Sequence, residues 1–237
     1  MNRLRIVIPT KNEEDYLPSL LYSIKEQTFK NLEVIVADAN SEDKTRIIAK
    51  SFGCGVVQGG YPDVGRNNGA RECTNQIICF MDSDTILPNR YFLENSIYEF
   101  NRRNLDVAGT TQKPILTGNF SKDLVYKMVY GITNFIMSLS QNTKKPFMQN
   151  VMFVKTDVHK KLNGFPPYEF GEDSAFAQGA VSKGYKFGIL KESGRVLISP
   201  RRFEKQGIFY MIKKYVYFNA MASLGHKFYR GKTKVRY

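Results

Sequence analysis

The 237-residue chain has no tryptophan, two histidines and three cysteines, at positions 54, 73 and 79. The cysteines are odd in number and form no CxxC pair, which argues against a disulfide framework and a thiolate zinc site and favours a reducing compartment. The longest uncharged stretch, residues 128–143, contains several polar side chains and is shorter than the ~20 apolar residues of a membrane-spanning helix. We therefore expect no transmembrane segment, and the strand-like start of the chain predicts no signal peptide.

Acidic residues are also scarce. The chain has 35 Lys and Arg against 22 Asp and Glu, which gives a net charge of +13 and a pI near 9.6. Residues 200–237 contain ten of the basic residues and one acid, Glu204, so they carry +9 of the excess. Such a tail favours phosphate on nucleic acid or anionic lipid, and the alternative is an ordinary solvated surface. The length and the 42% hydrophobic content are typical of one large folded domain.

The first half alternates short, β-branched apolar runs with segments of helical spacing. This pattern predicts βαβ units and a mostly parallel sheet, whose ligands bind beyond the carboxyl ends of the strands. The predicted strands are 4–9, 32–37, 55–58 and 76–81, and the predicted helices are 13–27, 41–52 (with Ser41 as N-cap) and 64–73. The second half predicts helices at 91–103, 119–139, 156–162, 170–183 and 207–224 and strands at 106–111, 147–154, 186–190 and 195–198.

Two acidic pairs stand out. Asp82-Ser83-Asp84 follows an apolar strand, and two carboxylates at this spacing suit one Mg²⁺ or Mn²⁺ ion, although Asp and Ser also form turns. Glu172 and Asp173 lie at a predicted helix start, where the dipole favours them and where one could act as a general base. Arg66 opens another helix after a glycine and could pair with phosphate, pair with a carboxylate, or lie on the surface.

Taken together, these segments resemble the family 2 glycosyltransferases, whose fold is called GT-A, over roughly residues 4 to 203. The resemblance rests on segments 7–14, 34–45, 65–71 and 80–84, and on Gly164-Phe165 followed by Gly171-Glu172-Asp173. Two departures are Ala39-Asn40 in place of the commoner Asp-Gly, and Ser199-Pro200-Arg201-Arg202-Phe203, which is similar to the Gln-x-x-Arg-Trp motif with Ser for Gln and Phe for Trp. These departures put the base of the nucleotide and processivity in doubt.

The resemblance implies a set of site residues. The nucleotide would be bound by Pro9, Thr10, Asn12, Glu13, Asp38, Arg66 and Asp82. Asp84, helped by Asp82, would hold Mn²⁺ or Mg²⁺, and Asp173 would be the catalytic base. Glu172 and Arg202 would contact the acceptor or a phosphate.

The implied activity is inverting transfer of a sugar from a UDP- or GDP-linked donor. The basic C-terminal region suits an anionic membrane surface, so we expect the acceptor to be a lipid-linked glycan or polyprenyl phosphate, and the protein to lie in the cytoplasm with peripheral contact to the inner face of the cell membrane. We expect an α/β GT-A domain over 1–203, with a mixed, mostly parallel sheet flanked by helices, and a basic amphipathic helical extension over 204–237. Tyr126, Tyr130 and Phe135 are expected either to join a membrane contact or to pack in the core.

Three further interpretations stay open at this point. Asp82-Ser83-Asp84-Thr85 also matches the strand-plus-DxDxT pattern of haloacid dehalogenase phosphatases, although that pattern normally opens a chain. The net charge and the 13% aromatic content would permit a nucleic-acid-binding module, but the basic excess lies in the tail and we expect no nucleic acid partner. His226 is either a third metal ligand or a solvated side chain, and His159 is expected to be structural.

Overall fold

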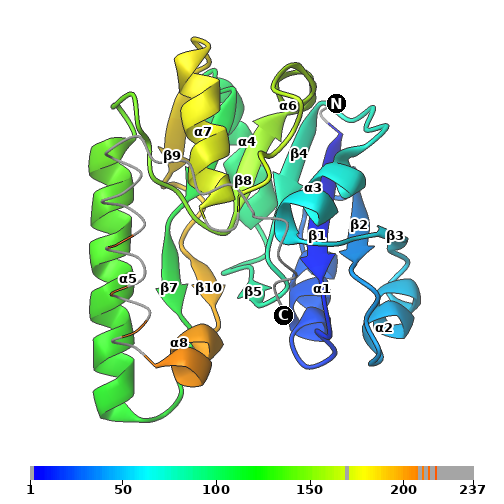
Figure 1. Cartoon of the computed structure of the whole chain (residues 1–237), viewed down its shortest axis with the longest axis vertical. Helices are drawn as coiled ribbons and strands as arrows, with labels where there is room; N and C mark the ends of the chain where they lie inside the picture. The colour runs from blue at the N-terminus through cyan, green and yellow to red at the C-terminus, as the bar shows by residue number, and fades with distance from the viewer. Residues whose placement is uncertain (1–2, 169–170, 208–209, 211–212, 214–216, 218–237) are drawn as a thin grey trace.

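A computed structural model describes residues 3–168, 171–207, 210, 213 and 217. Its main feature is a seven-stranded sheet in the order β3-β2-β1-β4-β8-β6-β9 (Figure 1). The strands are β1 (Leu4–Thr10), β2 (Leu32–Asp38), β3 (Gly55–Gln58), β4 (Ile77–Phe80), β6 (Val107–Thr110), β8 (Met152–Lys155) and β9 (Phe187–Leu190). Only β8 runs against its neighbours, so the predicted mixed, mostly parallel sheet is confirmed.

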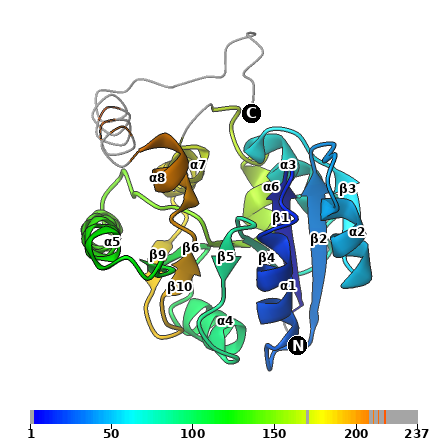
Figure 2. The ribbon, with the colours of Figure 1, turned by 90° about the horizontal axis from the view of Figure 1, so that it is seen from below.

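Helices cover both faces of this sheet. One face carries α1 (Leu17–Lys25), α2 (Thr45–Ser51) and α4 (Phe92–Arg102), and the other carries α3 (Pro62–Ala70), α6 (Thr156–Lys161) and α7 (Glu172–Ser182). The alternation along β1 explains this division, because Ile6 and Ile8 join the first core while Val7 joins the second. Figure 2 shows α4 and α7 on opposite sides of the sheet.

Strands β2 and β3 lie on one side of β1, and the chain then returns to place β4 on the other side, so the strand order reverses between β1 and β4. These two strands are parallel neighbours, and their carboxyl ends lie together. In open α/β sheets this switch point is where ligands bind. Thr10 ends β1, Asp38 ends β2, and Asp82 and Asp84 follow β4. The topology therefore brings the predicted polar motifs to one edge of the sheet.

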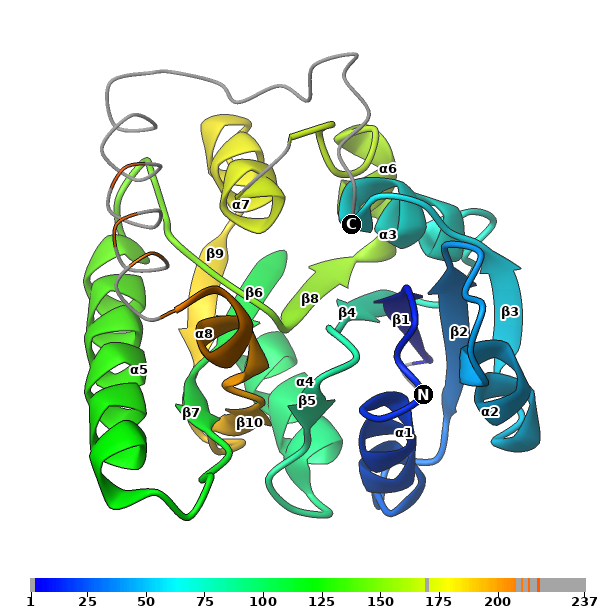
Figure 3. The ribbon, with the colours of Figure 1, turned by 60° about the horizontal axis from the view of Figure 1, so that its bottom comes forward.

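A smaller sheet and two helices complete that edge. The small sheet has the order β5-β10-β7 and consists of β5 (Thr85–Ile86), β10 (Val196–Ile198) and β7 (Gln112–Pro114). Helix α5 (Phe120–Ser140) packs against β7, and the Asn134 amide bonds the Gln112 backbone at both its N–H (3.0 Å) and its carbonyl (2.7 Å). Helix α8 (Arg201–Gln206) follows β10 and lies between α5 and the end of β4 (Figure 3).

Several sequence predictions need correction. Ser41 is not a helix N-cap: α2 begins at Thr45, and the Ser41 hydroxyl instead donates to Asp38. The strand predicted over 147–154 is confined to 152–155, and β5, β7 and α8 were not predicted because each is too short to show a period. The helix predicted over 207–224 falls almost wholly outside the described residues. Among the helices of the described part, none is long and apolar enough to cross a membrane.

His159 lies in an aromatic cluster, with ring centroids 5.5 to 6.0 Å from those of Phe80, Phe165 and Phe176. Burial, and secondarily the charge of Lys160, lowers the pKa of His159 to about 4. The neutral imidazole therefore contributes stability that is complete above the unfolded-state pKa of about 6.5 and is lost as the pH falls toward 4. This arrangement agrees with a structural role.

Replacing His159 with Phe is expected to remove that part of the acid sensitivity. Between pH 7 and pH 4.5 the free energy of unfolding of the wild type should fall by about 2 kcal/mol more than that of His159→Phe. Urea unfolding of both proteins at the two pH values measures the difference, and the carboxylates common to both cancel. Equal losses in the two proteins would contradict the assignment.

Candidate active site

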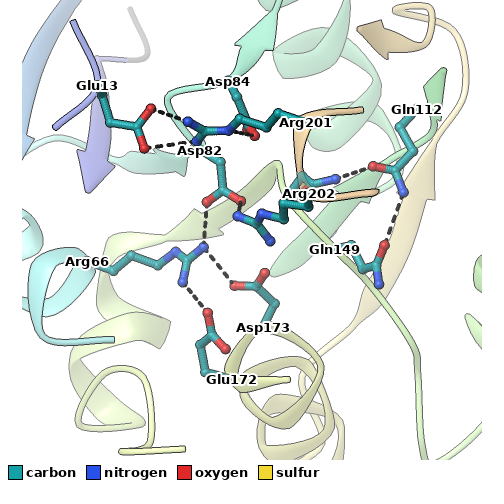
Figure 4. Close-up of polar contacts among 11 residues, drawn as sticks. Glu13, Arg66, Asp82, Asp84, Gln112, Gln149, Glu172, Asp173, Arg201 and Arg202 are labelled. Carbon is teal, nitrogen blue, oxygen red and sulfur yellow. Dashed lines mark hydrogen bonds and ion pairs between the residues drawn. The ribbon is translucent and has the colours of Figure 1, made fainter. Parts of the chain in front are cut away.

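Asp82 and Asp84 lie at the carboxyl end of β4 and face three guanidinium groups (Figure 4). Asp82 Oδ1 accepts from Arg66 Nη2 at 2.8 Å, and Asp82 Oδ2 accepts from Arg202 Nη2 at 3.2 Å. Asp84 Oδ2 accepts from Arg201 Nε at 2.8 Å. Asp84 Oδ1 is buried and has no hydrogen-bond partner in the described part of the chain, so this oxygen is available to accept from, or to coordinate, a ligand.

Arg66, from α3, is the centre of the network and is 2% exposed. Besides Asp82, it contacts Glu172 Oε1 at 2.6 Å and Asp173 Oδ1 at 3.5 Å, and its guanidinium lies 5.4 Å from the centre of the Phe165 ring. Burial alone would lower the pKa of Arg66, but the three carboxylates raise it above its ordinary value. Arg66 therefore stays charged and links Asp82 to Glu172 and Asp173 in one site.

Asp173 lies in the first turn of α7, which begins after Gly171 with its φ of +76°. Burial is the largest influence on this carboxyl and raises the pKa of Asp173 to about 8, although Arg66 opposes the shift. A buried carboxyl with a raised pKa among charged side chains has the property expected of a group that takes up a proton. The negative charge of Glu172 adds to the increase.

Two backbone features hold this side of the site together. Asn67 bonds both the backbone carbonyl (3.0 Å) and the N–H (2.8 Å) of Phe165. The φ of Gly164 is +77°, and a Cβ there would lie 2.3 Å from Asn67 Oδ1, so only glycine fits. The segment resembling the family's Gly-Phe motif thus positions the ring that packs against Arg66.

The loops after β1 and β2 form a second hydrogen-bonded group. Asp38 accepts from the hydroxyls of Thr10 (3.1 Å) and Ser41 (2.5 Å), and Asn12 bonds across the two loops to Ser41 Oγ (2.8 Å) and the Glu42 N–H (2.9 Å). The Asn12 φ of +53° gives the turn that this requires. Pro9 packs beneath α3, because a Cβ at Gly65 would lie 3.1 Å from Pro9 Cβ.

Arg201 is the site residue that the sequence did not predict. Its guanidinium bonds both oxygens of Glu13 at 2.7 and 2.9 Å as well as Asp84, and it lies 4.2 Å from the centre of the Tyr16 ring. The short β10 and α8 place it there, and the Ser199 N–H bonds the Asp84 carbonyl at 3.1 Å. The only signal in the sequence was a pair of adjacent arginines after an apolar run, and the weak motif match pointed to Arg202.

The donor set fits a divalent cation. Glu13, Asp82, Asp84, Glu172 and Asp173 face Arg66, Arg201 and Arg202, so five carboxyl groups meet three guanidinium groups, an excess of two negative charges when all five carboxyl groups are ionised. Within the described residues no group of three or more His, Cys, Asp or Glu could hold a metal. Mg²⁺ is commonly held by one or two carboxylates plus substrate phosphates, which matches Asp82 and Asp84. His226, predicted as an alternative third ligand, lies outside the described residues.

Two curated relatives of this chain are glycosyltransferases by name. Glycosyltransferase AglE of Haloferax volcanii is 25% identical over 193 residues, which cover 76% of this chain and 62% of the relative. A Campylobacter jejuni GalNAc(5)-diNAcBac-PP-undecaprenol beta-1,3-glucosyltransferase is 30% identical over 95 residues, 35% of this chain and 30% of the relative. The chain thus spans less than two thirds of the length of either protein.

Solved structures share the fold. Mannosyltransferase PcManGT from Pyrobaculum calidifontis, in complex with GDP-Man and Mn²⁺, superposes with a TM-score of 0.66 at 20% identity, covering 84% of this chain and 56% of that one. S. aureus TarS 1–349 in complex with UDP-GlcNAc gives 0.63 at 20% identity, covering 83% and 58%. These similarities confirm the predicted GT-A fold. Residues 5–162, more than half of the chain, match the model of Glycosyl transferase family 2, and the chain therefore belongs to that family.

Proposed function

We propose that this protein transfers a sugar from a nucleoside diphosphate sugar to an acceptor, with a divalent cation and with inversion at the anomeric carbon. The observation that carries the proposal is the buried Asp84 carboxylate, whose Oδ1 has no partner in the described part of the chain, at the switch point of the sheet beside Arg66, Arg201 and Arg202. The family membership favours this activity over phosphatase or nucleic-acid-binding alternatives.

The donor nucleotide would bind over the loops after β1, β2 and β4. Pro9, Thr10, Asn12 and Asp38 would form its base and ribose side, because these loops are already braced by their own hydrogen bonds. Arg66 and Asp82 would lie near the diphosphate. The two solved neighbours hold GDP-Man and UDP-GlcNAc, so both nucleotides are candidates.

Mn²⁺ or Mg²⁺ would be held mainly by Asp84, because both Asp82 oxygens already accept from arginines. When bound, the cation would neutralise charge that develops on the departing diphosphate. Arg201 would then exchange partners. Its guanidinium now pairs with Glu13 and Asp84, and a diphosphate bound beside it would offer oxygens that a guanidinium can bond in the same bidentate way.

Asp173 would take the proton from the acceptor hydroxyl as that oxygen attacks the anomeric carbon from the face opposite the diphosphate. Its burial and raised pKa support this role. Glu172 would hold Arg66 in place, and the half-exposed Arg202 would contact the acceptor or a phosphate. If the acceptor is a lipid phosphate, it is already ionised, and Asp173 would orient it.

We propose a lipid-linked acceptor, a lipid-linked glycan or polyprenyl phosphate, met at the cytoplasmic face of the membrane. The support is the C. jejuni relative, whose name specifies an undecaprenol-linked substrate, and the basic composition of residues 200–237. The division into a catalytic domain over 1–203 and an extension over 204–237 belongs to the same proposal.

Calorimetric titration with UDP and GDP, each with and without Mn²⁺, tests the donor class. We expect one of the two to bind at least tenfold more tightly with Mn²⁺ than without it, because the metal links the phosphates to Asp84. The next step is transfer from the matching sugar nucleotides. Failure of both nucleotides to bind under either condition would refute the proposal and would direct attention to hydrolysis of an aryl phosphate.

A further inference from the structure

Helix α5 exposes an unusually apolar face. Seven large apolar side chains on this helix, each between 45% and 82% exposed, form what we call the α5 band: Phe120, Leu124, Met128, Ile132, Phe135, Ile136 and Leu139. Their spacing places them along the whole helix, about 30 Å at 1.5 Å per residue. Monomeric proteins rarely expose contiguous apolar surface on this scale, and such surfaces commonly mark an interaction site.

The opposite face of α5 is committed to the fold. Tyr126 and Tyr130 pack on the Phe203 ring of α8 with centroids 5.7 and 5.9 Å apart, and Asn134 is bonded to β7. Of the aromatic residues that were open to both interpretations, Tyr126 and Tyr130 are therefore core residues and Phe135 is exposed. The helix cannot turn the band inward without losing its contact with α8.

The exposed charges on α5 itself and just beyond its end are positive. At 100° per residue, the exposed Lys122 and Lys127 fall on opposite edges of the band, and Lys144 and Lys145 follow its end. Asp123 is the only acid between residues 107 and 156, and it is buried, accepting bonds from the backbone N–H groups of Thr117 (2.8 Å) and Gly118 (3.2 Å). The exposed surface of this helix thus combines apolar side chains with lysines and no carboxylate.

We infer that the α5 band lies on an anionic lipid surface, in the plane of the membrane interface. An apolar face bordered by lysines is the pattern of interfacial helices, and anionic headgroups complement the lysines. A second copy of this chain would bring its own lysines against the lysines of the first copy, and like charges repel. Residues 208–237 contain no acid either, so this segment would also lack a complementary charge. An anionic lipid surface complements both the apolar side chains and the lysines of α5.

The position of α5 links this surface to the site. Phe203, which the buried face of α5 contacts, directly follows Arg201 and Arg202, the residues paired with Asp84 and Asp82. Figure 1 shows α5 along one edge of the molecule, beside β7 and β10. A bilayer on the band would therefore lie one helix diameter, about 10 Å, from α8. The inference rests on α5 alone and would stand if the proposed sugar transfer failed.

Vesicle flotation of the full chain tests it. We expect the wild type to float with vesicles of phosphatidylcholine and phosphatidylglycerol in equal parts, and tenfold less with phosphatidylcholine alone. Met128→Glu/Ile132→Glu should reduce the anionic-vesicle partition at least tenfold. The matched control is Tyr22→Glu/Ile47→Glu, which changes two equally exposed apolar residues on α1 and α2 and should bind like the wild type. Thermal unfolding of each variant verifies that the chain is folded.

Three results would overturn the inference. Wild-type protein that does not float with anionic vesicles excludes a lipid surface. A Met128→Glu/Ile132→Glu variant that floats like the wild type would assign binding to another surface, such as the basic tail. A wild type that is dimeric by light scattering, becomes monomeric in this variant and floats with neither vesicle would identify a second copy as the occupant. Nucleotide titration of the same variants separates these results from the proposed transferase activity.

Discussion

Asp84→Asn is expected to lower kcat/KM for sugar transfer by a factor on the order of 10³, because the cation would lose its main ligand and the departing diphosphate its neutralising charge. Asn keeps the size of the side chain and one oxygen but removes the negative charge. Asp84 Oδ2 now accepts from Arg201, and Oδ1 has no partner among the described residues. The substitution therefore removes the negative charge that Asp84 presents both to Arg201 and to any bound cation. Mn²⁺ binding followed by electron paramagnetic resonance, in the presence of nucleotide, gives a readout that does not depend on turnover.

The matched control is Asp106→Asn. Asp106 also pairs with a cation, Lys155 Nζ at 2.8 Å, but it precedes β6 at the opposite end of the sheet. This variant should lose some stability and keep Mn²⁺ binding. If Asp84→Asn binds Mn²⁺ and nucleotide as the wild type does, the metal site lies elsewhere and the proposed chemistry fails.

Arg201 makes the test more specific. Arg201→Gln removes a positive charge that lies against Asp84, so Mn²⁺ should bind more tightly without nucleotide than in the wild type. The same variant should bind the nucleotide diphosphate more weakly, because it lacks the guanidinium proposed to exchange onto the phosphates. Opposite effects on the two ligands would support the exchange. Parallel losses of both ligands would indicate that Arg201 merely holds the loop in shape.

The first half of the fold could be predicted because its signals are local. Strands β1, β2 and β4 are each an apolar run followed by a polar motif, and the switch-point rule alone brings residues 10, 38 and 82 to one edge. The contacts of Arg66 with Asp82, Glu172 and Asp173 were not derivable from spacing, since they join residues up to 107 positions apart. Here the resemblance to the family supplied what periodicity could not.

Other parts could not be predicted for physical reasons. Arg201 reaches the site because β10 is held between β5 and β7, and these two flanking strands are too short to show a detectable alternation. Ser41 has the composition of an N-cap, yet Asp38 competes for its hydroxyl and α2 starts at Thr45 instead. In α5 the sequence showed aromatic residues but not which of them face α8, because both faces of the helix are apolar.

Asp173→Asn is expected to reduce kcat by a factor on the order of 10³ while leaving the affinity for the nucleotide and Mn²⁺ within about threefold of the wild type, because a general base acts on the acceptor and not on the donor. Asn cannot take up a proton, but it keeps the shape of a side chain that is buried against Arg66. Single-turnover transfer and calorimetry on the same preparation separate the two quantities. Equal losses of binding and turnover would instead indicate that Asp173 maintains the Arg66 network.

The pH profile adds an independent test of the same group. Burial raises the pKa of Asp173 to about 8, and a base must be ionised, so kcat/KM should rise with pH and level off above about pH 8. Glu172 contributes to that increase, so Glu172→Gln should move the rising limb to lower pH, whereas Asp173→Asn should abolish it. An already ionised phosphate acceptor needs no base. With such an acceptor the limb would be absent in the wild type and Asp173→Asn would cost little in kcat, so the profile would distinguish a hydroxyl acceptor from a lipid phosphate.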